Sequence, residues 1–291
     1  MSISNTKELL LKATVGKYAV GAFNVTSIIQ MVAVVEAAVE VNSPVIIQTS
    51  VSPSKQLGPE LFGAAFRSIA EKAAVPVALQ LDHCTDVDFC KRCVDAGYTS
   101  IMIDASKQIF EENIRQTAKV VKYAHKNGYV SVEGELGTVG GVEDQLRVAN
   151  SEVELCDPDI AVEFVEKTSL DNLAPAIGTA HGIYKTQNPK IDVARLKKIA
   201  KTVNGNKTAA PLVIHGGTGL SEWIVKDLIA AGGSKFNVST ELKYSWIDAA
   251  KEYILNSETE YNPVKMNMMQ IVAAKKVVFN WINILGSEGK A

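Results

Sequence analysis

The sequence predicts an α/β protein built as a (β/α)8 barrel, or TIM barrel, and three observations support this. Eight short apolar runs rich in β-branched residues recur along the chain of 291 residues. Segments of helical period separate them, and the runs start roughly 30 residues apart, the length of one βαβ unit. The runs are almost uniformly apolar, which is typical of a parallel sheet covered on both faces.

The elements follow in order along the chain. The predicted strands span 18–23, 45–49, 77–81, 100–103, 129–132, 173–177, 212–214 and 236–238. Amphipathic stretches predict helices at 27–42, 86–96, 110–127, 192–203 and 221–231, with one more near the end at 272–284. An open doubly wound sheet is less favoured, because no Gly-rich turn follows the first strand. No Pro-, Ser- or Gly-rich linker divides the chain, so we expect residues 1–291 to form a single domain.

Composition and charge exclude several classes of protein. The chain is 47% hydrophobic and has 30 Lys and Arg against 32 Asp and Glu, a formal net charge of −2. This balance argues against nucleic-acid binding and against a disordered chain. The absence of a long apolar run or a recognisable signal peptide predicts no membrane association. Four cysteines are too few for a disulfide framework, so we expect a cytoplasmic protein.

Polar residues gather where the predicted strands end, which is where barrels of this kind carry their chemistry. Three of the four histidines fall there, namely His83, His181 and His215. Three imidazoles with an open fourth position are typical of a catalytic zinc site, although cobalt, manganese and iron also accept imidazole. The remaining one, His125, lies in the last turn of a predicted helix, where it suits the helix dipole.

Three carboxylates belong to the same rim. Asp82 precedes His83, and we expect it to do acid–base work. Asp104 and Glu135 have two interpretations, either as acceptors that orient the histidines or as a second metal position.

Backbone and hydroxyl groups after the last two strands suggest a phosphate site. Gly216-Gly217-Thr218 and Asn237-Val238-Ser239-Thr240 lie at predicted helix starts, where barrels commonly bind phosphate. The Gly-rich loop 137–144, which contains Glu143, is either an inert excursion or a lid that brings a carboxylate over the substrate.

Several motifs taken together resemble one family. They are Asp82-His83, Ile103-Asp104-Ala105-Ser106, Glu133-Gly134-Glu135-Leu136-Gly137, Gly178-Thr179-Ala180-His181-Gly182, His215-Gly216-Gly217 and Asn237-Val238-Ser239-Thr240. The set is similar to the class II, metal-dependent ketose-bisphosphate aldolases, which include fructose-1,6- and tagatose-1,6-bisphosphate aldolases. The resemblance extends from Ala22-Phe23-Asn24 to the end of the chain.

The resemblance implies a role for each site residue. It implies Zn²⁺ held by His83, His181 and His215, with Asp104 and Glu135 at an alternative or second divalent position. Asp82 matches the acid that protonates the nascent alcohol, and Glu143 matches the mobile carboxylate that moves the proton on the ketone half. Contacts to dihydroxyacetone phosphate are implied for Gly182, Gly216, Gly217, Thr218, Asn237, Val238, Ser239 and Thr240. We expect Asn24 and Ser50, which end the first two strands, to line the same site.

The resemblance also implies a partner set. It implies a sugar-phosphate substrate, a homodimer or homotetramer, and a monovalent cation, Na⁺ or K⁺. Independently of it, a divalent ion stabilises the enediolate of retro-aldol cleavage as a Lewis acid, whereas the alternative route uses a lysine Schiff base. Lys235 begins the eighth strand at the end away from the rim, so the metal route is favoured.

One departure concerns the far end of the substrate. The family usually carries an arginine near the C-terminus for the distal phosphate, but no arginine follows Arg195 here. Lys265 would supply only a point charge. The sequence therefore predicts an aldolase that cleaves a ketose bisphosphate to dihydroxyacetone phosphate and glyceraldehyde 3-phosphate, or one acting on a ketose phosphate without the distal group. A sugar-phosphate epimerase or isomerase and a non-catalytic aldolase-like subunit are the competing interpretations.

Overall fold

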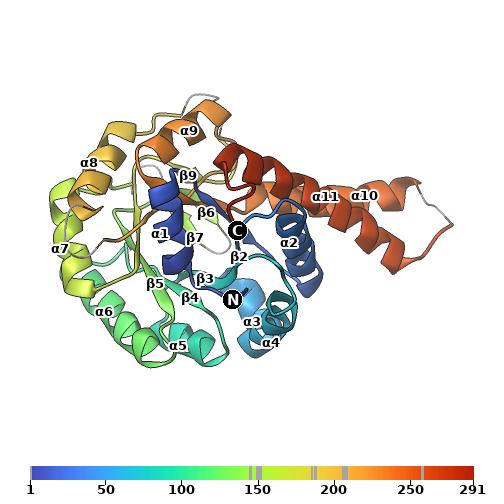
Figure 1. Ribbon diagram of the computed structural model, residues 1–291, viewed down its shortest axis with the longest axis horizontal. Helices are drawn as coiled ribbons and strands as arrows, with labels where there is room; N and C mark the ends of the chain where they lie inside the picture. The colour runs from blue at the N-terminus through green and yellow to red at the C-terminus, as the bar shows by residue number, and fades with distance from the viewer. Residues whose placement is uncertain are drawn as a thin grey trace.

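Eight parallel strands close into a barrel with helices around it (Figure 1). This computed structural model describes residues 2–143, 146–148, 153–184, 186, 189–204, 209–256 and 259–291, without the side chains of 142, 143 and 146–148. Around the barrel the order is β1-β2-β3-β4-β5-β8-β10-β11, and β11 pairs with β1. The predicted (β/α)8 barrel is confirmed.

The barrel strands agree closely with the predicted runs. They are β1 (Val20–Asn24), β2 (Val45–Thr49), β3 (Val77–Cys84), β4 (Ser100–Ile103), β5 (Ser131–Leu136), β8 (Asn172–Pro175), β10 (Leu212–Ile214) and β11 (Gly233–Val238). A small second sheet contains β6 (Gly140–Glu143), β7 (Leu146–Val148) and β9 (Ala180–His181). The predicted strands stop short of the observed ends of β3 and β5, where the polar site residues begin.

The helices include several that the sequence analysis did not predict. Those around the barrel are α2 (Ile28–Glu40), α3 (Val51–Leu57), α4 (Pro59–Ala70), α5 (Val87–Asp95), α6 (Phe110–Lys126), α7 (Pro158–Thr168), α8 (Val193–Asn204) and α9 (Glu222–Ala230). The chain also has α1 (Thr6–Gly16), α10 (Thr240–Asn256) and α11 (Pro263–Leu285). The last helix starts earlier than expected because Asn262 caps it, accepting hydrogen bonds from the backbone N–H groups of Val264 and Lys265.

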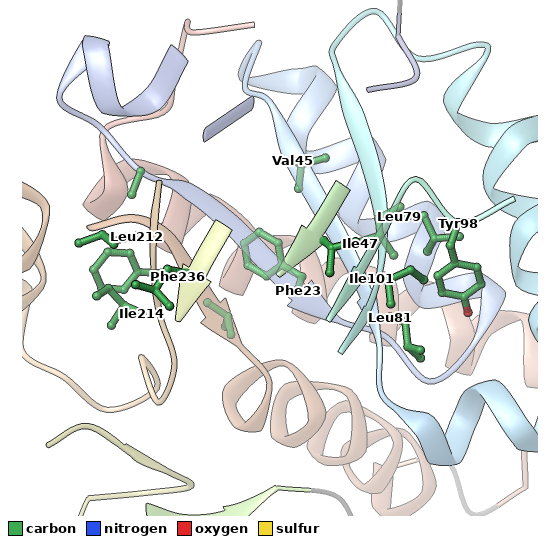
Figure 2. Packing of buried hydrophobic residues seen from close by; sticks show 14 of the residues in the cluster. Phe23, Val45, Ile47, Leu79, Leu81, Tyr98, Ile101, Leu212, Ile214 and Phe236 are labelled. Atoms are coloured by element: carbon green, nitrogen blue, oxygen red, sulfur yellow. The ribbon is translucent and has the colours of Figure 1, made fainter. Parts of the chain in front are cut away.

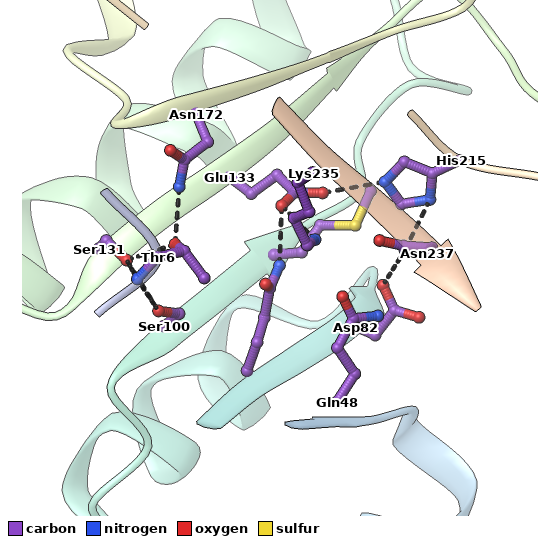
Figure 3. Close-up of polar contacts among 12 residues, drawn as sticks. Thr6, Gln48, Asp82, Ser100, Ser131, Glu133, Asn172, His215, Lys235 and Asn237 are labelled. Atoms are coloured by element: carbon purple, nitrogen blue, oxygen red, sulfur yellow. Dashed lines mark hydrogen bonds and ion pairs between the residues drawn. The ribbon is translucent and has the colours of Figure 1, made fainter. Parts of the chain in front are cut away.

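Helix α1 covers the amino-terminal end of the barrel. Its Leu9, Leu10 and Ala13 pack on small residues of the barrel interior. At its start the Thr6 N–H donates to Ser100 Oγ (2.9 Å), and the Thr6 hydroxyl lies 2.7 Å from Ser131 Oγ (Figure 3). With this end closed, the carboxyl ends of the strands remain as the place for a site.

The main hydrophobic core lies between the strands and the surrounding helices. Phe23, Ile47, Leu79, Ile101 and Phe236 all belong to it and are fully buried (Figure 2). Burial of this kind contributes about 25 cal/mol per Å² of apolar surface. The barrel is thereby a rigid support for the residues at its rim.

Helices α10 and α11 form an arm that projects from the barrel (Figure 1). Near the barrel, Trp281 Nε1 donates to Glu241 Oε2 at 2.7 Å and joins the two helices. Exposed apolar side chains lie along both, namely Tyr244, Ile247, Ile254, Leu255, Met268, Met269 and Val272. Neither of these helices nor any other described one has the length and apolar composition needed to cross a membrane.

Candidate metal centre

Three histidines from distant parts of the chain meet at the carboxyl end of the barrel. His83 lies in β3, His181 in β9, and His215 directly after β10. One ring nitrogen from each lies within 4.8 Å of the others. The rings meet edge to face, with the His83 and His215 centroids 4.5 Å apart. This is the convergence that a three-imidazole metal site requires.

His83 uses both of its ring nitrogens. Its Nε2 lies 2.8 Å from His215 Nδ1, and its Nδ1 lies 3.0 Å from Asp104 Oδ2. Its backbone is left-handed, with φ of 45°, a conformation uncommon outside glycine. Strained residues of this kind concentrate at functional sites.

Asp104 and Glu135 lie beside the same ring. His83, Asp104 and Glu135 offer a second set of ligand atoms within 4.8 Å of one another. The hydrogen bond from Asp104 to His83 matches the orienting role, whereas the clustering matches the metal position, so both interpretations remain. Glu135 Oε2 is buried without a hydrogen-bond partner among the described residues and lies 3.9 Å from His83 Nδ1, so it could serve as a metal ligand.

Next to His215, the ion pair of Glu133 and Lys235 lies inside the barrel (Figure 3). His215 Nε2 lies 2.9 Å from Glu133 Oε1. The other oxygen of Glu133 accepts from Lys235 Nζ at 2.7 Å and from Gln80 Nε2 at 2.8 Å. The sequence alone assigns no role to Glu133 and predicts Lys235 away from the rim. In the structure Lys235 is the third residue of β11, two residues before Asn237, and Glu133 links its ammonium to His215.

The electrostatics of the cluster favour a cation. Burial opposes protonation of His83, but the charges of Asp82, Glu135 and Asp104 outweigh it and raise the pKa of His83 well above its ordinary value. Burial and the neighbouring His83 charge lower the pKa of His215. These opposite shifts favour His83 Nε2 as the donor and His215 Nδ1 as the acceptor of the 2.8 Å contact between them.

The carboxylates respond to their surroundings in opposite ways. Burial and the Asp104 charge raise the pKa of Glu135 to about 8. Burial also opposes ionisation of Glu133, but Lys235 and the hydrogen bond from His215 outweigh it and lower the pKa of Glu133 to about 2. A divalent ion bound beside Glu135 would oppose the upward shift of its pKa and favour the ionised carboxylate that binds metal.

Asp82 lies next to the histidines and is fully buried. Its Oδ2 accepts from Asn24 Nδ2 at 2.7 Å. Its Oδ1 accepts from Asn237 Nδ2 at 3.2 Å (Figure 3). Asn237 Nδ2 also lies 3.2 Å from His215 Nδ1. Two amides thus fix the carboxylate beside the histidines at the rim.

The Gly-rich loop is paired with the strand that carries His181. Gly141 of β6 lies opposite His181 of β9 in a parallel ladder. A Cβ on Gly141 would lie 2.3 Å from the His181 carbonyl oxygen, and its φ is 99°, so only glycine fits. The backbone of Glu143 ends β6, but its side chain lies outside the described residues.

The predicted phosphate residues lie together at the rim. Gly216 and Thr218 follow β10, and Asn237 and Val238 end β11. Ser239 and Thr240 lead into α10, whose first N–H groups form a helix amino terminus suited to an anion. The other predicted substrate residues are Asn24, Ser50, Gly182 and Gly217, which end β1, follow β2, follow β9 and follow β10.

Comparison with known proteins agrees with this geometry. The family model described as "Fructose-bisphosphate aldolase class-II" matches residues 4–290. The chain belongs to the class II fructose-bisphosphate aldolase family. It is therefore an aldolase, a lyase of a metal-dependent family, which argues against the epimerase and non-catalytic interpretations.

Relatives of this aldolase match along their whole length. Fructose-bisphosphate aldolase of Geobacillus stearothermophilus is 40% identical, covering 100% of this chain and 99% of that protein. Among solved structures, the YdjI aldolase from Escherichia coli K12 is 33% identical with a TM-score of 0.85, covering 99% of both chains. A putative fructose-1,6-bisphosphate aldolase from Coccidioides immitis has a TM-score of 0.90 at 28% identity, covering 98% of this chain and 97% of that one.

Proposed function

We propose that this aldolase cleaves and forms fructose 1,6-bisphosphate or tagatose 1,6-bisphosphate, with dihydroxyacetone phosphate and glyceraldehyde 3-phosphate as the products of cleavage. The observation that carries the proposal is the convergence of His83, His181 and His215 within 4.8 Å beside a buried Asp82. The whole-length similarity to fructose-bisphosphate aldolases supports it.

Each residue has a part in the proposed reaction. The three histidines would hold Zn²⁺, and the bound ion would supply Lewis-acid stabilisation of the enediolate charge. Asp82 donates and accepts the proton of the C4 oxygen, since the amides of Asn24 and Asn237 hold its carboxylate in place. Glu143 moves the proton on the ketone half. The substrate contacts are Asn24, Ser50, Gly182, Gly216–Thr218 and Asn237–Thr240.

Metal removal tests the proposed centre. We expect dialysis against a strong chelator to abolish triose release, and added Zn²⁺ or Co²⁺ to restore it. Metal analysis of the wild type, Asp104→Asn and Glu135→Gln then tests whether these two residues bind a second divalent ion or only orient His83. Activity in Na⁺ and in K⁺ salts tests the expected monovalent cation separately. Full activity in a thoroughly demetallated sample would overturn the proposal.

A second candidate substrate is a ketose phosphate without the distal phosphate. No arginine follows Arg195. Lys265 pairs with Glu260, and the start of α11 lies at the outer end of the arm, away from the barrel (Figure 1). Within one chain Lys265 is therefore poorly placed for a substrate at the rim. A panel of ketose mono- and bisphosphates assayed for triose release separates the two candidates.

We also propose that the aldolase is a cytoplasmic homodimer or homotetramer. Exposed Ile254, Leu255 and Met268 on the arm support self-association, because apolar surface of this kind is commonly covered by a partner. The four cysteines are free and buried, which suits a reducing compartment. Light scattering should give twice or four times the chain mass, and Leu255→Asp should reduce it; a monomeric wild-type protein would contradict the proposal.

A further inference from the structure

A second buried carboxylate lies one step from the metal centre. The side chains of Glu133 and Lys235 are both 0% exposed. Removing two charges from water costs free energy that their mutual attraction often does not recover. An apolar pair of similar volume would stabilise a barrel interior at least as well, so the pair calls for an explanation beyond stability.

The contacts of Glu133 supply that explanation. Oε2 accepts from both Lys235 Nζ and Gln80 Nε2, and these two hydrogen bonds fix its position. The remaining oxygen, Oε1, lies 2.9 Å from His215 Nε2. Since an ionised carboxylate can only accept, His215 must carry a proton on Nε2.

The other ring nitrogen of His215, Nδ1, lies on the side of the metal centre. It lies 3.2 Å from Asn237 Nδ2, a donor, and 2.8 Å from His83 Nε2. With the proton held on Nε2, the lone pair of Nδ1 faces the centre and is available to a metal. In the opposite tautomer a proton would occupy that place.

We propose that Glu133, held by Lys235 and Gln80, is a positioning residue that fixes the tautomer of His215 and thereby sets the affinity for the metal. The inference rests on the proposed metal centre. Hydrogen-bond partners of metal-binding histidines act in this way in general, and losing one typically costs 10–100-fold in metal affinity.

The informative substitution is Glu133→Gln. Lys235 and Gln80 both donate towards the Oε2 position, so the introduced carbonyl turns to them. The introduced NH₂ then faces His215 Nε2 and favours the tautomer with its proton on Nδ1. We expect zinc to bind about 10–100-fold more weakly, measured by competition with a chromophoric chelator.

The chain offers a matched control at the opposite end of the barrel. Asp171 is also buried between a lysine and a histidine, accepting from Lys7 Nζ at 2.9 Å and lying 2.7 Å from His125 Nε2. Asp171→Asn removes an equivalent charge far from the centre. We expect it to lower thermal stability and to leave zinc affinity unchanged.

A second comparison separates positioning from stability. The variants Glu133→Gln/Lys235→Met and Glu133→Met/Lys235→Met both replace the ion pair by neutral side chains of similar size. Only the first retains an acceptor for His215, because Gln80 can turn its amide and accept the introduced NH₂ through Oε1, an atom without a hydrogen-bond partner among the described residues. We expect the first variant to bind zinc at least about 10-fold more tightly than the second.

The outcomes distinguish this inference from the proposed centre. If wild-type protein binds no zinc, or His181→Ala does not weaken binding, the proposed centre itself is wrong. If the wild type binds zinc at the three histidines but Glu133→Gln binds it equally well, the positioning role alone is wrong. Equal losses in Glu133→Gln and Asp171→Asn, or equal affinities in the two double variants, would also overturn it.

Discussion

Replacing Asp82 by alanine separates its chemical role from its structural one. The carboxylate is fully buried and accepts one hydrogen bond from Asn24 (2.7 Å) and one from Asn237 (3.2 Å). Its removal leaves two buried amide donors without that acceptor, at about 1–3 kcal/mol each. We therefore expect a measurable loss of stability in a protein that still folds.

The effect on turnover should be larger than the effect on stability suggests. Loss of a positioned acid or base costs about 10²–10⁴ in rate, or about 3–5 kcal/mol in the activation barrier. Because the histidines remain, Asp82→Ala should still bind one zinc ion. The loss should therefore appear in kcat, with little change in zinc stoichiometry.

The assay measures triose phosphate release from the best substrate, with zinc content and the melting temperature of the same sample. Asp82→Asn serves as the control for packing, because it keeps the volume and one acceptor but cannot ionise. Both variants should lose turnover, and Asn should be the more stable. A kcat near the wild-type value in either folded, zinc-loaded variant would show that another group moves the proton.

Three further predictions concern backbone fit, a buried hydrogen bond and pH. Gly141→Ala should weaken zinc binding at least about 10-fold by displacing the backbone of His181. The control is Gly128→Ala, which is also at positive φ but has open space around it and should cost only about 1–2 kcal/mol of stability. Equal zinc affinities in the two variants would contradict this prediction. Asp171→Ala should lower the free energy of unfolding by about 1–3 kcal/mol, measured by denaturant titration, because it leaves the buried Val132 N–H without its acceptor. The partly exposed Lys7 keeps its hydrogen bond to Tyr129, so its charge adds little. No measurable change would contradict this. The pKa of Glu133 is lowered to about 2 in the folded protein, from an ordinary value of 4.5. As the pH falls, Glu133 therefore becomes protonated in the unfolded chain before it does so in the folded one. Its stabilising contribution is complete above pH 4.5 and is lost as the pH falls towards 2. The metal-free wild type should lose more stability over that range than metal-free Glu133→Gln does, and parallel curves would refute the assignment.

Apolar strands made most of the fold predictable. Runs such as 45–49 and 100–103 agree with β2 and β4 residue for residue. The predicted ends failed where a strand continues into functional residues. β5 was expected to end at 132, but it continues to Leu136 and buries Glu133 and Glu135 on one face. In the sequence alone, two glutamates two residues apart do not look like part of a buried strand. Their burial becomes understandable only from the histidine and lysine side chains that they contact in the structure.

The rim histidines could be predicted because the carboxyl ends of all barrel strands lie at the same face, however far apart the strands are in the sequence. Their supporting residues could not be predicted in the same way. Gln80, Glu133 and Lys235 come from three separate strands, and only the register of the barrel brings their side chains together. Likewise, the sequence predicts that His125 lies at the end of a helix. Its contact with Asp171 could not be predicted, because that contact depends on how α6 packs beside the start of β8.

The pairing of β6 with β9 has a thermodynamic consequence. Gly140 and Gly141 share a ladder with Ala180 and His181, so one imidazole of the centre belongs to the same hydrogen-bonded unit as the strand ending at Glu143. Formation of the ladder and binding of the metal ion are therefore linked equilibria. If metal binding stabilises the ladder by some factor, then formation of the ladder raises the metal affinity by the same factor. Amide exchange at Gly141 and His181 should therefore slow when zinc is added.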